Sequence, residues 1–248
     1  MSFTGGMERS VRKTPTVGIH IPLETASSRR SIMALKGEYD QQVFINCPFD
    51  DDYLSLLRPL LFTVRFFGFI PRIASERLDS AENRIDKICS IIKDCLYSIH
   101  DLSRLRASEE GQYFRMNMPF ELGIDYGLRY FGAAKFKRKK FLILERDRYE
   151  FQKAISDLSG VDIKAHKNEP DEVVRNVRNW FVEAANLVNP PSPRQAWYSF
   201  NDFTSDFYDA RSAEGYTDED LNIMPIPEYI DFIDRWVASI GGDVNSRT

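Results

Sequence analysis

The stretch Leu96-Tyr97-Ser98-Ile99-His100-Asp101-Leu102-Ser103 predicts a buried β-strand that ends in a polar loop, and Asn117-Met118-Pro119-Phe120-Glu121-Leu122-Gly123-Ile124-Asp125-Tyr126-Gly127 predicts a helix after it. Ligands of open α/β sheets bind beyond the carboxyl ends of strands. Asp101 is expected at such an end. Glu121 is expected in the first turn of the helix, because Pro119 suits a helix start, where no N–H is lost. The two carboxylates mark a candidate ligand site.

The start of this helix leaves two interpretations of Glu121. Asn117 or Met118 is expected to cap the helix, whose positive dipole end would keep the carboxylate ionised at neutral pH, ready to meet a positive charge developing on a substrate. Asp125 follows four residues later on the same face. In the alternative interpretation, Glu121 is only a capping-box partner of the helix start and Asp125 is a solvated neighbour.

The rest of the chain alternates short apolar runs with helical periodicity. Strands are expected at residues 43–49, 69–74, 96–100, 141–145 and 161–163, and helices at residues 53–67, after a cap at Ser80, and at residues 117–131, 149–158 and 170–188. Pro71 favours an edge position for the second strand. The alternation predicts an α/β fold with a doubly wound, mainly parallel five-stranded sheet.

Composition shifts divide the chain into three parts. Residues 1–40 mix Gly, Ser, Thr and basic residues without a period, which predicts a flexible N-terminal arm. Residues 41–189 form the expected α/β domain, in which the loop from Arg104 to Arg115 suits a mobile cover over a site. The Pro-rich run 189–193 precedes an acidic, aromatic extension, residues 190–248. We expect two short helices there that pack on the main domain or on another subunit, or that complete its core.

The composition excludes several classes of protein. The 248 residues carry a net charge of −4, so nucleic acid is not an expected partner. Three cysteines and three histidines lack metal-ligand spacing, which predicts no metal site and a reducing cytoplasm. No apolar run approaches the roughly 20 residues of a membrane span, and the N-terminal region lacks a signal-peptide apolar core.

Known catalytic motifs narrow the chemistry further. The chain has neither a Gly-rich dinucleotide fingerprint nor a phosphate-binding loop, and no Gly-x-Ser-x-Gly elbow. The remaining candidates for catalysis are the carboxylates of Asp101, Glu121 and Asp125. Carboxylates suit cleavage of a C–N glycosidic bond, because they stabilise or capture an oxocarbenium-like centre.

At these residues the chain resembles the nucleoside 2-deoxyribosyltransferase family and its relatives among Toll/interleukin-receptor (TIR)-like nucleotide hydrolases. Residues 43–49 (Val-Phe-Ile-Asn-Cys-Pro-Phe) resemble the family's first strand and its small-residue, Pro, aromatic turn, and residues 98–103 resemble its strand-end Asp-Leu-Ser. Phe120-Glu121-Leu122-Gly123 resembles its Phe-Glu-x-Gly helix start, and residues 139–144 resemble the following strand. The chain departs from the family in the longer 103–117 loop, in Met118-Pro119 and in both terminal extensions.

The resemblance implies a flavodoxin- or TIR-like fold and an N-glycosidase that acts on a nucleotide or nucleoside, with NAD as a candidate substrate and no cofactor. Glu121 would be the nucleophile and Asp101 the ribose or base anchor. The implied substrate contacts are Asn46, Phe49, Ser103, Asn117 and Asp125, and Arg115 or Asn117 would reach a phosphate. The TIR-like branch implies NAD hydrolysis by a bacterial antiphage defence effector, and the other branch implies deoxynucleoside exchange.

A non-catalytic interpretation stays open beside these two. In it, the same pocket senses a nucleotide and the C-terminal segment contacts a protein partner or a second copy of the chain. The terminal extensions favour a regulated protein of this kind.

Overall fold

The computed structural model describes residues 39–76, 79–104 and 116–245, and for residues 241–245 the backbone alone. In chain order the elements are β1 (Gln42–Asn46), α1 (Leu54–Phe66), β2 (Ile70–Ile73), α2 (Arg84–Asp94), β3 (Tyr97–Asp101), α3 (Asn117–Phe131), β4 (Lys140–Glu145), β5 (Lys164–Ala165), α4 (Pro170–Ala185), α5 (Pro193–Ala213), α6 (Asp218–Asn222) and α7 (Ile226–Asn245). The expected arm, apart from residues 39–40, and the expected cover loop, apart from Arg104, lie outside the described residues.

The five strands form one parallel sheet with the order β2-β1-β3-β4-β5. This order confirms the predicted doubly wound α/β fold, and Pro71 lies in the edge strand β2 as expected. The chain moves outward from β1 to β2 and then returns to place β3 on the other side of β1. The carboxyl ends of β1 and β3 are therefore the switch point of the sheet, where ligands of such folds bind.

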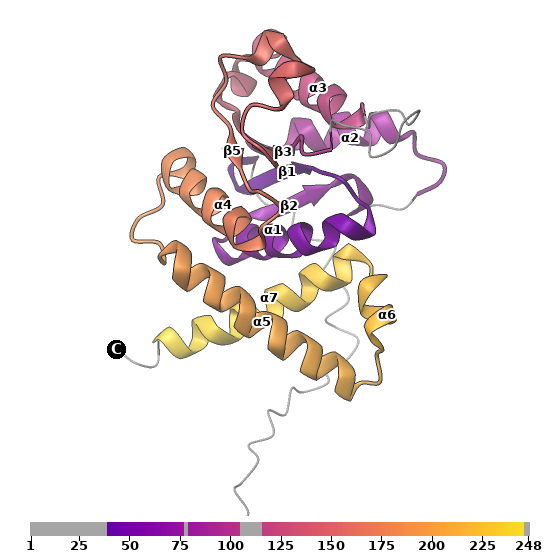
Figure 1. The fold of residues 1–248 in the computed structure, drawn as a ribbon, viewed down its shortest axis with the longest axis vertical. Helices are drawn as coiled ribbons and strands as arrows, with labels where there is room; N and C mark the ends of the chain where they lie inside the picture. Colours follow the sequence, from indigo (N-terminus) through magenta and orange to yellow (C-terminus); the bar gives the residue numbers. More distant parts are fainter. Residues whose placement is uncertain (1–38, 77–78, 105–115, 246–248) are drawn as a thin grey trace, which may run out of the picture. The chain divides into compact units, whose positions relative to one another are not determined.

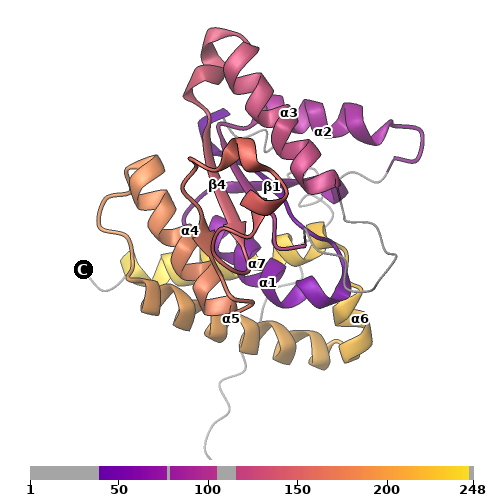
Figure 2. The same ribbon diagram turned by 45° about the horizontal axis from the view of Figure 1, so that its top comes forward.

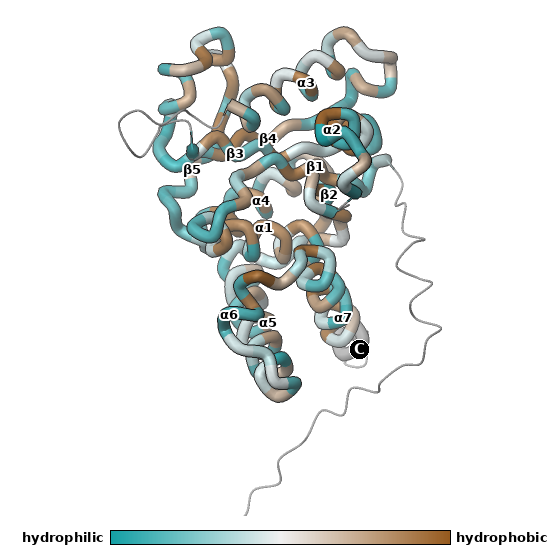
Figure 3. The backbone as a smooth tube through the Cα atoms, turned by 90° about the vertical axis from the view of Figure 1, so that its right-hand side faces the viewer, coloured by the Kyte–Doolittle hydropathy of each residue, from teal (hydrophilic) through white to brown (hydrophobic). Residues whose placement is uncertain are grey.

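Helices cover both faces of the sheet (Figure 1). Val43 and Ile45 of β1 belong to the core cluster shared with α1 and α4, whereas Phe44 between them packs with apolar residues of α2 and α3. This alternation follows from the two-residue period of a strand. Figure 3 shows the same arrangement by hydropathy: the strands and α1 carry hydrophobic stretches at the centre, and α6 is largely hydrophilic.

The C-terminal helices add a further layer against α1 and α4 (Figure 2). Phe62 of α1 is fully buried, and its ring lies 5.1 Å from that of Phe203 and 5.8 Å from that of Trp236. These rings belong to one apolar cluster with residues of β1, β3 and β4, and residues 37–248 form one compact unit. The Pro-rich run thus lies in the connection between α4 and α5, with Pro193 as the first residue of α5, and the C-terminal helices complete the core.

Several local expectations were wrong. Asn83, not Ser80, caps α2, and its side chain accepts a hydrogen bond from the N–H of Ile85. The helix expected at 149–158 consists of two short 3₁₀ segments, 151–153 and 156–158, and the last strand lies at 164–165 instead of 161–163. The two helices expected to be short, α5 and α7, span 21 and 20 residues.

The shared core predicts a single unfolding transition. Phe203→Ala removes a fully buried ring that contacts both α1 and α7, so the free energy of unfolding of the whole chain should fall by about 3–5 kcal/mol. Urea unfolding, followed by circular dichroism and tryptophan fluorescence together, measures this. The control is Tyr198→Ala on the exposed side of α5, expected to change stability by at most about 0.5 kcal/mol. If residues 190–248 of the variant instead unfold in a separate transition, and the remainder of the chain unfolds as in wild type, these residues are an appendage.

Candidate functional site

Asn46 ties three elements together at the switch point. Its side-chain Nδ2 donates to the carbonyl oxygen of Met118 in the first turn of α3 at 2.8 Å, and lies 3.1 Å from Nδ1 of His100 in β3. Asn46 is buried, yet its Oδ1 has no hydrogen-bond partner among the described residues. Asn46 therefore sets how the start of α3 approaches the carboxyl ends of β1 and β3, and it carries an unused acceptor there.

Asp101 ends β3 and is completely buried. The Tyr53 hydroxyl donates to its Oδ2 at 2.5 Å, the Ser103 N–H donates to its Oδ1 at 2.8 Å, and Nε2 of His166 lies 3.2 Å from Oδ2. Burial favours the neutral acid, but His166 and then the hydrogen bonds from Ser103 and Tyr53 outweigh it and lower the pKa of Asp101. Asp101 is consequently ionised at neutral pH, with both oxygen atoms held by protein groups.

Glu121 has a different environment. Its side chain is 5% exposed, and the one partner that the described part of the chain gives it is Arg84, whose Nη2 lies 3.8 Å from Oε1. Burial raises the pKa of Glu121 to about 7, and the charge of Arg84 lowers it only in part. Two expectations about Glu121 were wrong: it is the fifth residue of α3, beyond the first turn, and the helix dipole does not keep it fully ionised at neutral pH.

Asp101 and Glu121 both raise the pKa of Cys47. Burial raises the pKa of the Cys47 thiol well above its ordinary value, and the negative charges of Asp101, Glu121 and Asp50 raise it further. Cys47 is therefore a neutral thiol at physiological pH. Because both Asp101 and Glu121 influence it electrostatically, the ends of β1 and β3 and the start of α3 converge around this residue.

Asp125 faces the interior and is not the solvated neighbour of the alternative interpretation. It is completely buried, accepts a hydrogen bond from the Ser98 hydroxyl at 2.5 Å, and lies 3.3 Å from Nε2 of His100 and 3.1 Å from Nζ of Lys139. Burial opposes its ionisation, but His100, Lys139 and Ser98 together lower its pKa. Through these partners, Asp125 holds α3 on the sheet.

The other expected contacts differ in accessibility. Phe49, after β1, is 37% exposed, and Asn117 is exposed as the first residue of α3. The Ser103 hydroxyl oxygen is buried and has no hydrogen-bond partner in the part of the chain that the structure describes, so it resembles Oδ1 of Asn46. Arg115 lies outside the described residues. Asn46, Asp101 and Ser103 thus lie at the switch point, and Glu121 lies in α3, whose first turn Asn46 contacts.

Sequence reasoning missed Tyr53, Arg84 and His166. Tyr53 immediately precedes α1, and Arg84 is the first residue of α2. His166 directly follows β5, so its place at the carboxyl edge of the sheet was the signal that could have found it. Recognising that signal required the true end of the last strand, which the sequence places a few residues too early.

Cofactor and membrane features are scarce in the part of the chain that is described. No group of three or more His, Cys, Asp or Glu side chains there is arranged to hold a metal ion. None of the described helices has the length and apolar character of a membrane span. Comparison of the chain with protein-family models, curated proteins and solved structures found no match.

The raised pKa of Glu121 predicts a pH-dependent stability effect. Between about pH 4.5 and 7 the folded chain keeps a proton that the unfolded chain has lost, so ionising Glu121 destabilises the fold as pH rises. Glu121→Gln removes the ionisable group and with it this loss of stability. The variant should be more stable than wild type at pH 8 by about 1–3 kcal/mol, and the difference should shrink toward pH 5.

Urea titrations of both proteins at pH 5 and pH 8 measure this difference. The control is Asp86→Asn, which neutralises an exposed carboxylate on α2. If Glu121→Gln gives no gain at pH 8, the carboxyl group is already well stabilised as an ion and the proposed environment is wrong.

Proposed function

We propose that this protein is an N-glycosidase that acts on a nucleotide or nucleoside, with Glu121 as the group that meets the anomeric carbon. The observation that carries the proposal is the contrast between two buried carboxyl groups. Asp101 is held by Tyr53, Ser103 and His166, whereas Glu121 has a single weak contact, with Arg84, among the described residues. A buried carboxyl with a strongly perturbed pKa beside a sheet switch point is typical of a functional group.

The chemistry follows from the state of Glu121. In its ionised form the carboxylate attacks the anomeric carbon as the C–N bond breaks, and the electrons of that bond leave with the base. Water then hydrolyses the glycosyl ester, which returns the carboxylate and releases the sugar. Desolvation makes the carboxylate a better nucleophile and favours its contact with a positively charged oxocarbenium-like centre.

The state of Asp101 bears on the substrate. Its lowered pKa leaves it no proton to give to a leaving base at neutral pH. A substrate whose base is already cationic, such as the pyridinium ring of NAD, leaves as a neutral molecule without an acid. This favours NAD-type hydrolysis over exchange between deoxynucleosides, whose bases leave more readily when protonated. Asp101 then positions Ser103 instead of touching the leaving base.

Two polar atoms support a sugar at this place. Within residues 39–76, 79–104 and 116–240, Oδ1 of Asn46 has no hydrogen-bond donor and the Ser103 hydroxyl has no partner; both atoms are buried near neighbouring strand ends. Buried polar groups are normally paired, so unused ones suit a hydroxyl-rich ligand or the water that it displaces. Phe49 adds an exposed ring at the end of β1 on which a base can stack.

The test is turnover of NAD and of deoxynucleosides by the purified chain. We expect release of free base from NAD, and we expect Glu121→Gln to lower kcat by about a thousand-fold while the chain stays folded. Asp86→Asn, an exposed carboxylate on α2, is the matched control and should keep wild-type rates.

The other outcomes assign the remaining candidates. Transfer of the sugar to a second nucleoside instead of water would make the protein a deoxyribosyltransferase. Binding of nucleotide without turnover by either protein would identify a sensor and overturn the enzymatic proposal. Full activity of Glu121→Gln would exclude Glu121 as the reacting group.

A further inference from the structure

His166 occupies a strained turn at the carboxyl edge of the sheet. Its N–H donates to the carbonyl oxygen of Glu145 at the end of β4 at 2.9 Å. The next two residues, Lys167 and Asn168, have φ angles of 55° and 62°, in the left-handed region that non-glycine residues rarely adopt. Two successive residues in this conformation store strain, and such strain concentrates at functional sites.

The strained turn fixes the proton of the imidazole ring. It directs the N–H of Asn168 onto Nδ1 of His166 at 3.0 Å. A ring nitrogen that accepts a hydrogen bond carries no proton, so in the neutral ring the proton lies on Nε2. Nε2 is the atom that lies 3.2 Å from Oδ2 of Asp101. The backbone of the turn therefore directs the protonated ring nitrogen toward this carboxylate, within ion-pair distance of Oδ2 although the two atoms lack the geometry of a hydrogen bond.

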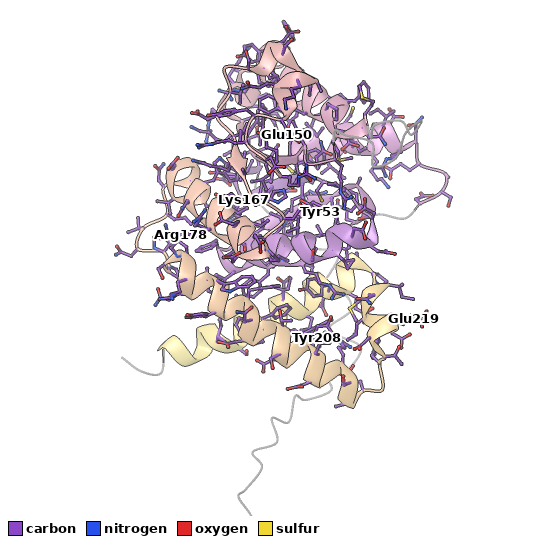
Figure 4. The ribbon with its side chains drawn as sticks, in the orientation of Figure 1. Tyr53, Glu150, Lys167, Arg178, Tyr208 and Glu219 are labelled. Atoms are coloured by element: carbon purple, nitrogen blue, oxygen red, sulfur yellow. The ribbon has the colours of Figure 1, made fainter. Side chains whose placement is uncertain are left out.

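Tyr53 reaches the same oxygen from another element. Its hydroxyl, at the start of α1, donates to Oδ2 of Asp101 at 2.5 Å, and its ring is 1% exposed. Figure 4 labels Tyr53 and Lys167 and shows the start of α1 near the turn after β5. Oδ2 thus accepts the Tyr53 hydroxyl and lies 3.2 Å from Nε2 of His166, and the other oxygen, Oδ1, accepts the N–H of Ser103. Ser103, the second residue after β3, is thus positioned through Asp101 by groups that lie directly before α1 and directly after β5.

We propose that His166 is a positioning residue of the glycosidase site, which acts through Asp101 to hold Ser103 in the geometry that receives the sugar. His166 itself is completely buried and does not touch the substrate. The inference rests on the proposed function for its kinetic consequence, whereas the contact between His166 and Asp101 can be tested without any substrate.

The kinetic experiment compares substitutions that keep or remove the donor. His166→Leu removes it and should lower kcat by about ten- to a hundred-fold, with KM changed less. His166→Gln places an amide N–H near the position of Nε2 and should restore the rate to within about three-fold of wild type.

The matched control is Asn176→Ala. Asn176 of α4 donates to the carbonyl oxygen of Ala165 at 3.0 Å, so its loss loosens the end of β5 without touching Asp101. Its kcat should stay within about three-fold of wild type. If His166→Leu does not fold, Tyr53→Phe is measured in its place. This change removes the hydroxyl that donates to Oδ2 of Asp101 and keeps the buried ring.

The substrate-independent experiment is a nitrogen-15 correlation spectrum of the three histidine rings. We expect His166 in the neutral Nε2–H form, with ring signals that shift in Asp101→Asn. A ring with its proton on Nδ1, or ring signals that do not shift in Asp101→Asn, would overturn the proposal.

The proposal is also overturned if Asn176→Ala and His166→Leu lose kcat equally, or if His166→Leu keeps the wild-type kcat. Failure of His166→Gln to restore the rate would overturn it as well. A wild-type chain without turnover would refute the proposed function alone, and the spectrum would then decide whether His166 orients Asp101.

Discussion

The ion pair between Asp125 and Lys139 is the interaction on which the arrangement of the site depends. Both side chains are completely buried, and Nζ of Lys139 also donates to the carbonyl oxygens of Ile92 at 2.9 Å and Cys95 at 2.5 Å. One ammonium group thereby joins α3, the end of α2 and the start of β4. Losing one partner would leave an unpaired charge in the interior, which is strongly destabilising. Because Asp125 lies one helical turn after Glu121, the pair also fixes where Glu121 stands.

This anchoring gives neighbouring carboxyl groups opposite roles. Asp125 and Asp101 are compensated by internal donors and stay ionised, as buried charges require. Glu121, on the same helix as Asp125, is buried with only Arg84 to compensate its charge among the described residues, and burial therefore raises its pKa. Proteins tolerate such local cost at sites that act on a ligand. The contrast between the carboxyl groups, more than their number, singles out Glu121.

The sequence predicted the architecture well because periodicity and Pro positions report directly on local structure. Strand β3, its terminal Asp101 and the edge strand with Pro71 all lie where expected. The C-terminal aromatic residues were expected to need a partner, and here most are buried against α1, so exposed aromatic surface no longer argues for an oligomer. The aromatic content of these helices indicated that they pack against something but carried no information about which surface they cover.

The site was predicted less completely, because its chemistry depends on contacts between distant residues. Asp101 and Tyr53 are 48 positions apart, and no spacing rule links them or joins His166 to either. The environment of Glu121 was misjudged for the same reason, since a helix start predicts the dipole but not the burial that outweighs it. Asn46 was expected to contact a substrate, and its bond to Met118 adds a role in placing α3.

The most direct measurement is a crystal structure of the chain with a non-hydrolysable NAD or nucleoside analogue. The account predicts that the anomeric carbon lies about 3–3.5 Å from a carboxylate oxygen of Glu121, with the sugar beside Asn46 and Ser103. A ligand bound elsewhere, or one bound at the switch point with its sugar remote from Glu121, would contradict it.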